Sequence, residues 1–357
     1  MTIMKIRGGD LDLVEYEFIS FSPGENLKTL NLKRSYALKI NEKAVKVKAP
    51  GRIHLTVLDM NRFAPGHPGG GGIGFAIQIY GEVEVRCSPS GNTIDYCRPA
   101  IIEHFLMLFS EVTGYSGGFS VKAVDHEYKH VGLGSTGTIL MAVAVAVNHV
   151  VGEPLTRDQL RVLIGHNYIE ETEGGKVAYG FETGVGPAVI NYGGMAVMGD
   201  DLTLVYQKEF AVDKYVHIVI PPSEISSAGE EEFSLLMNKA RTLDYRDREQ
   251  KAYCILMDFI PALHQGDITR MGEIMWEIEF RGSKRAEVEH HSFELYHYMH
   301  RLRKAGLEFV GMSSVGPSIA IITSRSADEI SGILDSMGLS LAITTAVDNT
   351  GITLHEC

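Results

Sequence analysis

The chain has 357 residues, of which 45% are hydrophobic and 22% charged, a balance typical of a globular protein long enough for two domains. Its net charge of −12 argues against a nucleic-acid partner, because proteins that bind nucleic acids carry basic surfaces. The four cysteines form no C-x-x-C pair, which argues against a zinc site and is typical of the reducing cytoplasm, where we expect this protein. The N-terminus has no apolar signal core and the longest apolar run is too short to cross a bilayer, so we expect no membrane partner.

The first half of the chain is predicted to contain strands, helices and glycine-rich loops. Residues 1–43 are expected to be irregular or to form short strands, with a turn at 22–24. Alternation at period two over residues 44–49 predicts a half-buried strand that ends at Pro50 and Gly51. Further strands are predicted at 52–59, 73–80, 83–85 and 117–124, and a helix at 100–112.

The second half is predicted to mix the same elements. Thr156 and Gln159 have the spacing of a capping box and predict a helix that begins there. Strands are predicted at 204–210, 216–220, 318–323 and 339–345, and helices at 231–238, 248–265, 268–279, 291–305 and 327–337. This order predicts an α+β or mixed α/β fold, and we place a domain boundary between residues 1–205 and 206–357.

The stretch His130–Thr138 is rich in glycine and hydroxyl residues and precedes an apolar run at 139–147. Glycines let the backbone approach a ligand, and the first amides of a helix favour an anion. The residues that would bind a phosphate are Gly132, Leu133, Gly134, Ser135, Thr136, Gly137 and Thr138. A tight turn with a Ser/Thr cap before a core helix explains these residues equally well.

Four segments concentrate glycine, hydroxyl and charged residues: 52–74, 130–138, 174–194 and 311–318. In this order they resemble the GHMP kinase superfamily, and more closely its β-ribofuranosylaminobenzene 5′-phosphate synthase family. The matching motifs are Arg52-Ile53-His54, Asp59-Met60-Asn61, Gly71-Gly72-Ile73-Gly74, His130-Val131-Gly132-Leu133-Gly134-Ser135 and Gly311-Met312-Ser313-Ser314-Val315-Gly316-Pro317. The resemblance implies a GHMP-type α+β fold with a ribosomal-S5-like first domain and a ferredoxin-like second domain.

The resemblance also implies a reaction. Phosphoribosyl pyrophosphate would be joined to 4-aminobenzoate or 4-hydroxybenzoate with loss of CO2 and pyrophosphate, in tetrahydromethanopterin biosynthesis. We expect Mg²⁺ as the cofactor and a homodimer as the assembly. The chain departs from the family pattern at Pro68, Gly69 and Gly70, where an Arg-x-Asp is common, and at residues 136–138. An ATP-dependent small-molecule kinase and a non-catalytic phosphate-binding paralogue therefore stay open as alternatives.

Roles for single residues follow from the same resemblance. Asp59 and His54 are the candidate catalytic residues, and Asp59 and Glu182 the candidate metal ligands. The candidate substrate-binding residues are Arg52, Asn61 and His130. The candidates for binding a second phosphate are Ser313, Ser314 and Gly316. From its residue type alone, Asp59 could equally cap the following turn, and His54 could be a structural histidine. The basic cluster Arg281, Lys284 and Arg285 is expected to be a solvated face.

Overall fold

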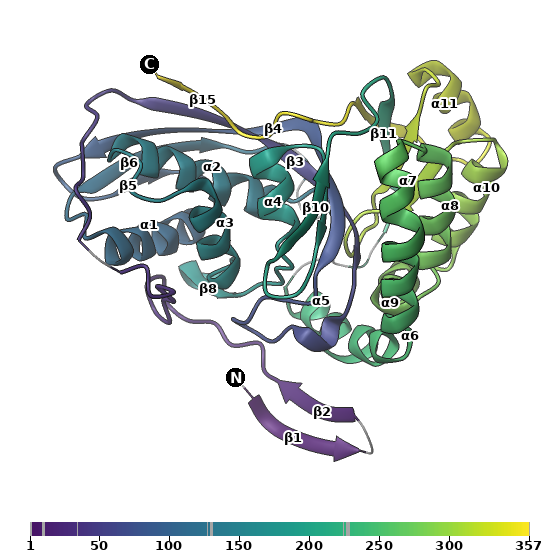
Figure 1. Ribbon diagram of the computed structural model, residues 1–357, viewed down its shortest axis with the longest axis horizontal. Coiled ribbons are helices and arrows are strands. Elements are labelled where there is room, and N and C mark those ends of the chain that lie inside the picture. Colours follow the sequence, from purple (N-terminus) through teal and green to yellow (C-terminus); the bar gives the residue numbers. More distant parts are fainter. Residues whose placement is uncertain are drawn as a thin grey trace.

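Two main β-sheets carry the fold of the computed structural model, which describes residues 2–8, 11–33, 35–126, 128, 131–223, 225 and 229–356 (Figure 1). The seven-stranded sheet has the order β10-β9-β4-β3-β15, with β6 beside β4 and β5 beside β6. Its strands are β3 (Val45–Val57), β4 (Gly72–Ser88), β5 (Thr93–Asp95), β6 (Gly118–Val124), β9 (Met195–Met198), β10 (Leu204–Lys208) and β15 (Thr353–Glu356). The four-stranded sheet has the order β12-β13-β11-β14, from β11 (Tyr215–Val219), β12 (Phe309–Met312), β13 (Ile319–Thr323) and β14 (Leu341–Thr345).

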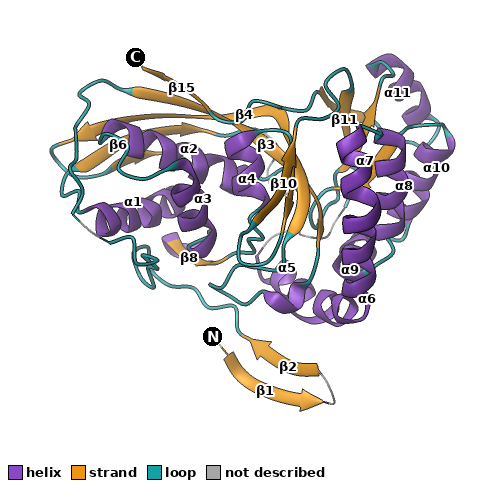
Figure 2. Cartoon of the chain, in the orientation of Figure 1, coloured by secondary structure: helices purple, strands orange, loops and turns teal. Residues whose placement is uncertain are grey.

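Helices lie against both sheets (Figure 2). Those beside the seven-stranded sheet are α1 (Pro99–Thr113), α2 (Ser135–Val150), α3 (Arg157–His166) and α4 (Val185–Tyr192). A long helical stretch follows with two π-helical segments, as α5 (Gly229–Leu235), η3 (Leu236–Ala240), α6 (Arg241–Cys254), η4 (Ile255–Phe259) and α7 (Ile260–Gln265). The remaining helices are α8 (Ile268–Ile278), α9 (Gly282–His291), α10 (Glu294–Lys304) and α11 (Ala327–Asp335).

Smaller elements complete the described chain. The strands β1 (Thr2–Gly8) and β2 (Leu11–Tyr16) form one antiparallel pair, and β7 (Ile169–Thr172) and β8 (Lys176–Tyr179) another. Two short 3-10 helices are η1 (Met60–Arg62) and η2 (Glu173–Gly175). None of the helices in the described ranges is long and apolar enough to span a membrane.

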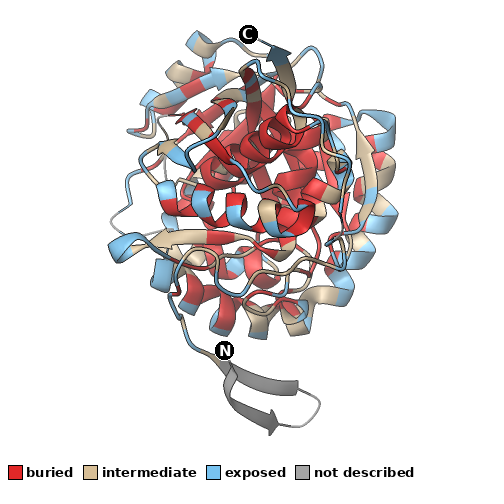
Figure 3. Ribbon diagram, turned by 90° about the vertical axis from the view of Figure 1, so that its left-hand side faces the viewer, coloured by how far each residue is buried: buried red, intermediate tan, exposed pale blue. Residues whose placement is uncertain are grey.

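Most of the interior is buried (Figure 3), and the buried hydrophobic residues form connected clusters. The first lies between β3, β4, β6 and the helices α1, α2 and α3, and α2 is buried along nearly its whole length. The second joins the seven-stranded sheet to β11, α7 and α8. The third packs α10 and α11 on the four-stranded sheet. The expected α+β class is confirmed, and the helix α2 lies where the apolar run predicts a core helix.

Strand β3 corrects one prediction from the sequence. The strand does not end at Pro50 and Gly51 but runs on to Val57, with an irregularity in its pairing to β4 between these two residues. A proline lacks the amide that a ladder needs, and here the register shift accommodates it. The uninterrupted strand matters for function because it carries Arg52 and His54.

Other differences concern elements that the sequence patterns missed. Residues 185–192 form the helix α4 inside the second glycine-rich segment, and residues 282–291 form α9. Residues 239–247 are helical too, which joins two helices that we expect to be separate. The boundary at residue 205 stays a prediction, although β15 returns from the C-terminal end of the chain to pair with β3.

Candidate functional site

Three segments that are far apart in the sequence meet at strand β3. The Nη1 of Arg52 donates to the carbonyl of Gly132 over 2.9 Å, and the Ser313 hydroxyl donates to the same carbonyl over 2.7 Å. The Ser313 hydroxyl also accepts the backbone N–H of His54 at 3.1 Å. The backbone N–H of Ser314 donates to the His54 carbonyl at 2.6 Å. The first, second and fourth of the glycine-rich segments therefore form one junction.

Glycine is required in the loop at this junction. Gly132 and Gly134 have φ angles of +89° and +78°, in the left-handed region. A Cβ on Gly134 would lie 2.6 Å from Cγ of Arg52, and a Cβ on Gly132 would lie 2.4 Å from the Ser313 carbonyl oxygen. Gly134 is also the N-cap of α2, so the guanidinium of Arg52 lies beside the N-terminus of that helix. A cation and a helix N-terminus together favour an anion.

The hydroxyl groups of this helix N-terminus already have protein partners. Arg98 donates from Nη2 to the Ser135 hydroxyl at 2.9 Å and from Nη1 to the Thr136 hydroxyl at 2.6 Å. The Thr136 hydroxyl donates in turn to Glu170 at 2.8 Å, and Arg98 is paired with Asp125 at 3.0 Å. A phosphate at this loop would therefore be bound by backbone amides and Arg52 more readily than by these two hydroxyls. Their predicted role in phosphate binding stays a prediction.

A cavity opens next to the junction, and four carboxylates from four different segments line it. They are Glu170 of β7, Glu182 just before α4, Glu232 of α5 and Glu287 of α9. They share the cavity with Arg52, His54, Tyr168, Thr183 and Ser314, and with Gly134 and Gly137 of the glycine-rich loop. Six of the predicted site residues thus line one cavity: Arg52, His54, Gly134, Gly137, Glu182 and Ser314.

Burial keeps two of these carboxyl groups partly protonated near neutral pH. It raises the pKa of Glu182 to about 7, against the opposing effect of the Gly184 amide, which donates to Oε1 at 2.6 Å, and of Arg52. Burial also raises the pKa of Glu232 to about 8, and the neighbouring carboxylates act in the same direction. The cavity therefore carries less negative charge than its four carboxylates would suggest.

His54 is neutral in this setting. Its side chain is buried, and Nε2 lies 3.2 Å from the Thr183 hydroxyl. Burial lowers its pKa well below the usual value, and the positive charges of Arg52 and Lys284 act in the same direction. A neutral imidazole can donate or accept a hydrogen bond with a ligand, but it provides no positive charge to bind an anion. The catalytic role predicted for His54 stays a prediction.

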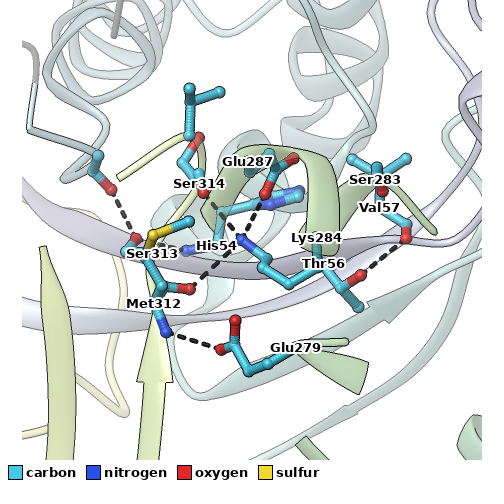
Figure 4. A network of polar contacts seen from close by, with 12 residues as sticks. His54, Thr56, Val57, Glu279, Ser283, Lys284, Glu287, Met312, Ser313 and Ser314 are labelled. Atoms are coloured by element: carbon cyan, nitrogen blue, oxygen red, sulfur yellow. Dashed lines mark hydrogen bonds and ion pairs between the residues drawn. The ribbon is translucent and has the colours of Figure 1, made fainter. Parts of the chain in front are cut away.

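A buried lysine supports the late glycine-rich loop from behind (Figure 4). Lys284 is fully buried, and its Nζ donates to the Ser314 carbonyl at 2.8 Å and lies 3.4 Å from the Met312 carbonyl. It is ion-paired with Glu287 at 2.5 Å. The expectation of a solvated face is therefore wrong for Lys284, because α9 turns this residue inward, although Arg285 remains exposed. Lys284 connects the Ser314 loop to a carboxylate of the cavity.

A second buried carboxyl group near Lys284 is that of Glu279. Glu279 is fully buried at the end of α8 and accepts the Met312 N–H at Oε1 over 2.8 Å (Figure 4). Burial raises the pKa of Glu279 to about 7, and the nearby positive charge of Lys284 opposes that shift. Glu279 lies outside the cavity lining, so it holds the loop rather than a ligand.

Asp59 and Asn61 lie at the edge of the site and bind each other. Asp59 caps η1, and its Oδ1 accepts the backbone N–H of Asn61 at 3.0 Å and the Asn61 side-chain amide at 2.9 Å. The same amide donates to the Arg241 carbonyl, and Asp59 Oδ2 lies 3.5 Å from Arg248. Neither residue lines the cavity. The geometry thus matches the capping alternative, and their catalytic and substrate-binding roles stay predictions.

Two further predicted residues are His130 and Gly316. His130 lies outside the described residues. Gly316 has a φ of +91° and closes a turn in which its N–H donates to the Ser313 carbonyl at 2.9 Å. It shapes the loop that presents Ser314, and its role in binding a phosphate stays a prediction.

Of the two predicted magnesium ligands, Glu182 lines the cavity and Asp59 does not. In the described ranges, no three His, Cys, Asp or Glu side chains form a group that could hold a metal. Magnesium often keeps several waters and is held by one or two carboxylates together with substrate phosphates. Glu182, which lines the cavity, fits as one such carboxylate. Asp59 does not line the cavity, and its oxygens contact Asn61 and Arg248, so its role as a metal ligand stays a prediction.

Comparisons with known proteins agree with this arrangement. No protein-family model matches the chain. Two curated relatives are named β-ribofuranosylphenol 5′-phosphate synthase. The one from Archaeoglobus fulgidus is 28% identical over 80% of this chain and 90% of its own length. The one from Methanothermobacter thermautotrophicus is 26% identical over 85% of this chain and 97% of its own length. The resemblance expected from the motifs is confirmed, and the relatives are named as enzymes.

Solved structures decide the fold. A homoserine kinase from Cytophaga hutchinsonii matches with a TM-score of 0.62 at 15% identity, over 90% of this chain and the whole of that one. A mevalonate diphosphate decarboxylase from Staphylococcus aureus matches with a TM-score of 0.63 at 17% identity, over 88% and 98%. The chain has the GHMP fold.

Within the GHMP fold, the site contains residues that the sequence did not single out. Arg98 gives no sequence signal beyond its place before the first proline of α1. Glu170, Glu232 and Glu287 come from elements whose orientation toward the cavity depends on tertiary packing. Lys284 and Glu287 have the i,i+3 spacing of an ion pair, but that spacing occurs mostly on exposed helix faces and so does not predict burial.

Proposed function

We propose that this protein transfers a phosphoribosyl group from phosphoribosyl pyrophosphate to an aromatic acid, with loss of CO2 and pyrophosphate. The observation that carries the proposal is the cavity in which Arg52, His54 and Ser314 meet the N-terminus of α2. The motifs that form this cavity are those on which the resemblance rests. Similarity over most of the chain to two relatives named β-ribofuranosylphenol 5′-phosphate synthase supports the same function.

The chemistry needs no outside oxidant, reductant or net proton. The bond between the anomeric carbon and the pyrophosphate oxygen breaks, and its electron pair leaves with pyrophosphate. The ring carbon that bears the carboxylate forms a bond to the anomeric carbon. The bond to the carboxylate carbon then breaks, CO2 leaves, and its electron pair restores the aromatic ring. Such a reaction depends on stabilising charge at the leaving group and at the sugar cation.

The residues of the cavity fit these two needs. Arg52 and the amides at the N-terminus of α2 would bind the anionic leaving group. Glu182 would face the sugar cation, the role that the resemblance gives to Asp59, because Glu182 lines the cavity and Asp59 does not. A magnesium ion brought by the pyrophosphate would add positive charge to the leaving group.

The acceptor is proposed to be 4-hydroxybenzoate. The product in the name of both relatives is a ribofuranosylphenol phosphate, and loss of CO2 from a 4-hydroxybenzoate adduct gives a phenol. With 4-aminobenzoate the same reaction would give the corresponding aniline. We propose that the reaction belongs to tetrahydromethanopterin biosynthesis, as the resemblance implies.

The test is a measurement of CO2 release. The protein is incubated with Mg²⁺, phosphoribosyl pyrophosphate and carboxyl-labelled 4-hydroxybenzoate or 4-aminobenzoate. We expect release that depends on phosphoribosyl pyrophosphate and is faster with 4-hydroxybenzoate. No release with either acid overturns the proposal. Formation of ADP from ATP with a panel of alcohols would instead support the kinase alternative, and bound pyrophosphate without turnover would support a binding protein.

A pair of arginine variants makes the test specific to the site. Arg52→Gln removes the guanidinium beside α2 and is expected to lower the rate about 100-fold or more, as loss of a charge-stabilising donor does. Arg62→Gln is the matched control, because Arg62 is exposed and pairs only with Asp200 among the described residues, at 3.6 Å. Equal rates in the two variants would show that Arg52 does not contribute to the reaction.

A further inference from the structure

Part of the cavity lining is apolar. Besides Ile190, six apolar side chains line the cavity: Val57, Met60, Phe63, Phe181, Leu236 and Val315. All six belong to one hydrophobic cluster, Phe181 at its edge, and this cluster joins the loop after β3 to helices α5 and α9 and to η3. The cavity lining therefore includes one connected apolar part, which we call the apolar wall.

Phosphoribosyl pyrophosphate does not account for the apolar wall. Its sugar and phosphate groups are polar or charged over most of their surface. Bringing such a molecule against six apolar side chains would strip water from its polar groups without replacing the lost hydrogen bonds. The apolar wall therefore fits a second ligand that has an apolar face.

Two phenylalanines give this wall its shape. The rings of Phe63 and Phe181 have centroids 4.6 Å apart and planes inclined by 36°. Phe63 is buried, whereas Phe181 is only half-buried. Aromatic rings attract one another in offset or tilted arrangements, which adds to the hydrophobic effect. A flat aromatic ligand has the surface that such a pair binds well.

The chain joins the apolar wall directly to polar residues of the cavity. Phe181 is followed by Glu182 and Thr183, and the Thr183 hydroxyl lies 3.2 Å from Nε2 of His54. A ring held against Phe181 would thus lie next to the residues proposed to face the sugar cation. This is the relative position that the carbon–carbon bond of the reaction needs.

We propose that Phe63 and Phe181, with Met60 and Leu236, form the subsite for the ring of the aromatic acid. The inference rests on the proposed function for the identity of the acid. The binding of an aromatic ring to this wall does not depend on turnover and can be measured separately. The two phenylalanines are therefore the residues that select an aromatic acceptor.

The kinetic test compares three leucine variants. Phe181→Leu is expected to raise KM for 4-hydroxybenzoate about tenfold and to leave KM for phosphoribosyl pyrophosphate within twofold. Phe63→Leu is expected to act in the same direction. Phe233→Leu is the matched control, because Phe233 packs on Phe181 at 5.9 Å between centroids but does not line the cavity. Its two KM values are expected to stay within twofold of those of the unchanged protein.

A binding test separates this inference from the proposed function. Saturation-transfer NMR measures the binding of 4-hydroxybenzoate and of its saturated analogue, 4-hydroxycyclohexanecarboxylate, without phosphoribosyl pyrophosphate. We expect the aromatic acid to bind more tightly than the analogue, and Phe181→Leu to remove most of that preference. Absence of CO2 release with intact binding overturns the function alone. Binding and KM for the acid that are unchanged in both Phe63→Leu and Phe181→Leu overturn the subsite alone.

Discussion

At the scale of single residues, the position of Glu182 couples its protonation to the reaction. Its carboxyl must be ionised to stabilise a sugar cation, and burial raises its pKa to about 7. The ionised fraction, and with it kcat, is therefore expected to rise as the pH increases from 6 to 8. Glu182→Gln should abolish this rise and lower the maximal rate about 100-fold. The measurement is kcat against pH for both proteins.

Glu232 supplies the control for this experiment. Its pKa is raised to about 8, so it also changes charge near the same pH. Glu232→Gln is expected to keep the rise near pH 7 that belongs to Glu182. If the rise disappears in Glu232→Gln and persists in Glu182→Gln, the roles of the two carboxyls are reversed.

The prediction for Glu279 concerns the free energy of unfolding and not the rate of the reaction. Burial raises its pKa in the folded protein to about 7, above the ordinary value of 4.5. Between these two pH values the folded protein binds more protons than the unfolded chain, so the free energy of unfolding falls as the pH rises through this window. The loss from this group is about 3 kcal/mol at most, from roughly 2.5 pKa units.

The variant Glu279→Gln should remove this dependence. The Gln side chain can still accept the Met312 N–H, and it does not ionise. Denaturant unfolding at pH 5 and pH 8 is expected to show a smaller fall in the free energy of unfolding for Glu279→Gln than for the unchanged protein. Glu277→Gln, in the exposed part of the same helix, should behave like the unchanged protein. Parallel pH dependences in all three proteins would contradict the prediction.

At the scale of elements, the start of α2 can be tested through its N-cap. Gly134→Ala places a methyl group in a left-handed conformation and 2.6 Å from Cγ of Arg52. We expect a loss of stability of about 1–2 kcal/mol from strain and a loss of activity, because Arg52 must move. Gly114→Ala is the control, because Gly114 has a φ of +75° at the C-cap of α1 with no other heavy atom within 4 Å of the added Cβ.

The Gly114→Ala control separates the effect of backbone strain on stability from the effect of moving Arg52 on activity. Gly114→Ala is expected to lose similar stability and to keep its rate of CO2 release. Thermal unfolding and the release assay are measured on both variants. If Gly134→Ala is as active as Gly114→Ala, then Arg52 does not have to lie beside the helix N-terminus for catalysis.

The same elements show what the sequence could predict. The capping box at Thr156 and Gln159 forms as predicted, because both hydrogen bonds are local to one helix turn. The strand through Pro50 could not be predicted, because a pairing irregularity with β4 decides it. Helix α4 could not be predicted because its glycine and proline, and the glycines on either side, are typical of loops, although a proline is tolerated in the first turn of a helix.

For the site, the sequence predicted the segments better than the roles. Short contiguous motifs predict Arg52, His54 and Ser314 as site residues, and in the structure all three line one cavity. Asp59 belongs to such a motif too, but it hydrogen-bonds Asn61 and does not line the cavity. The burial of Lys284 and the apolar wall depend on how α9, α5 and η3 pack on the first half. No local pattern contains that information.

At the scale of the whole molecule, the two sheets share one interior. The second hydrophobic cluster contains Phe75 of β4 together with Val216 and Ile218 of β11. Strand β15 returns from the end of the chain to pair with β3. Neither sheet can lose its packing without exposing apolar surface of the other, so we expect the molecule to unfold as one cooperative unit.

Two alanine variants test this expectation by calorimetry. Phe75→Ala removes a ring from the shared cluster, and Phe109→Ala removes one from the cluster that the first half builds with Ile352 from the end of the chain. Each should lower the free energy of unfolding by about 3–5 kcal/mol. If the halves unfold together, each variant shifts a single transition to lower temperature. If instead Phe109→Ala produces a second transition that stays at the original temperature, the four-stranded sheet with its helices is stable by itself, and the cavity is lost when the first half unfolds alone.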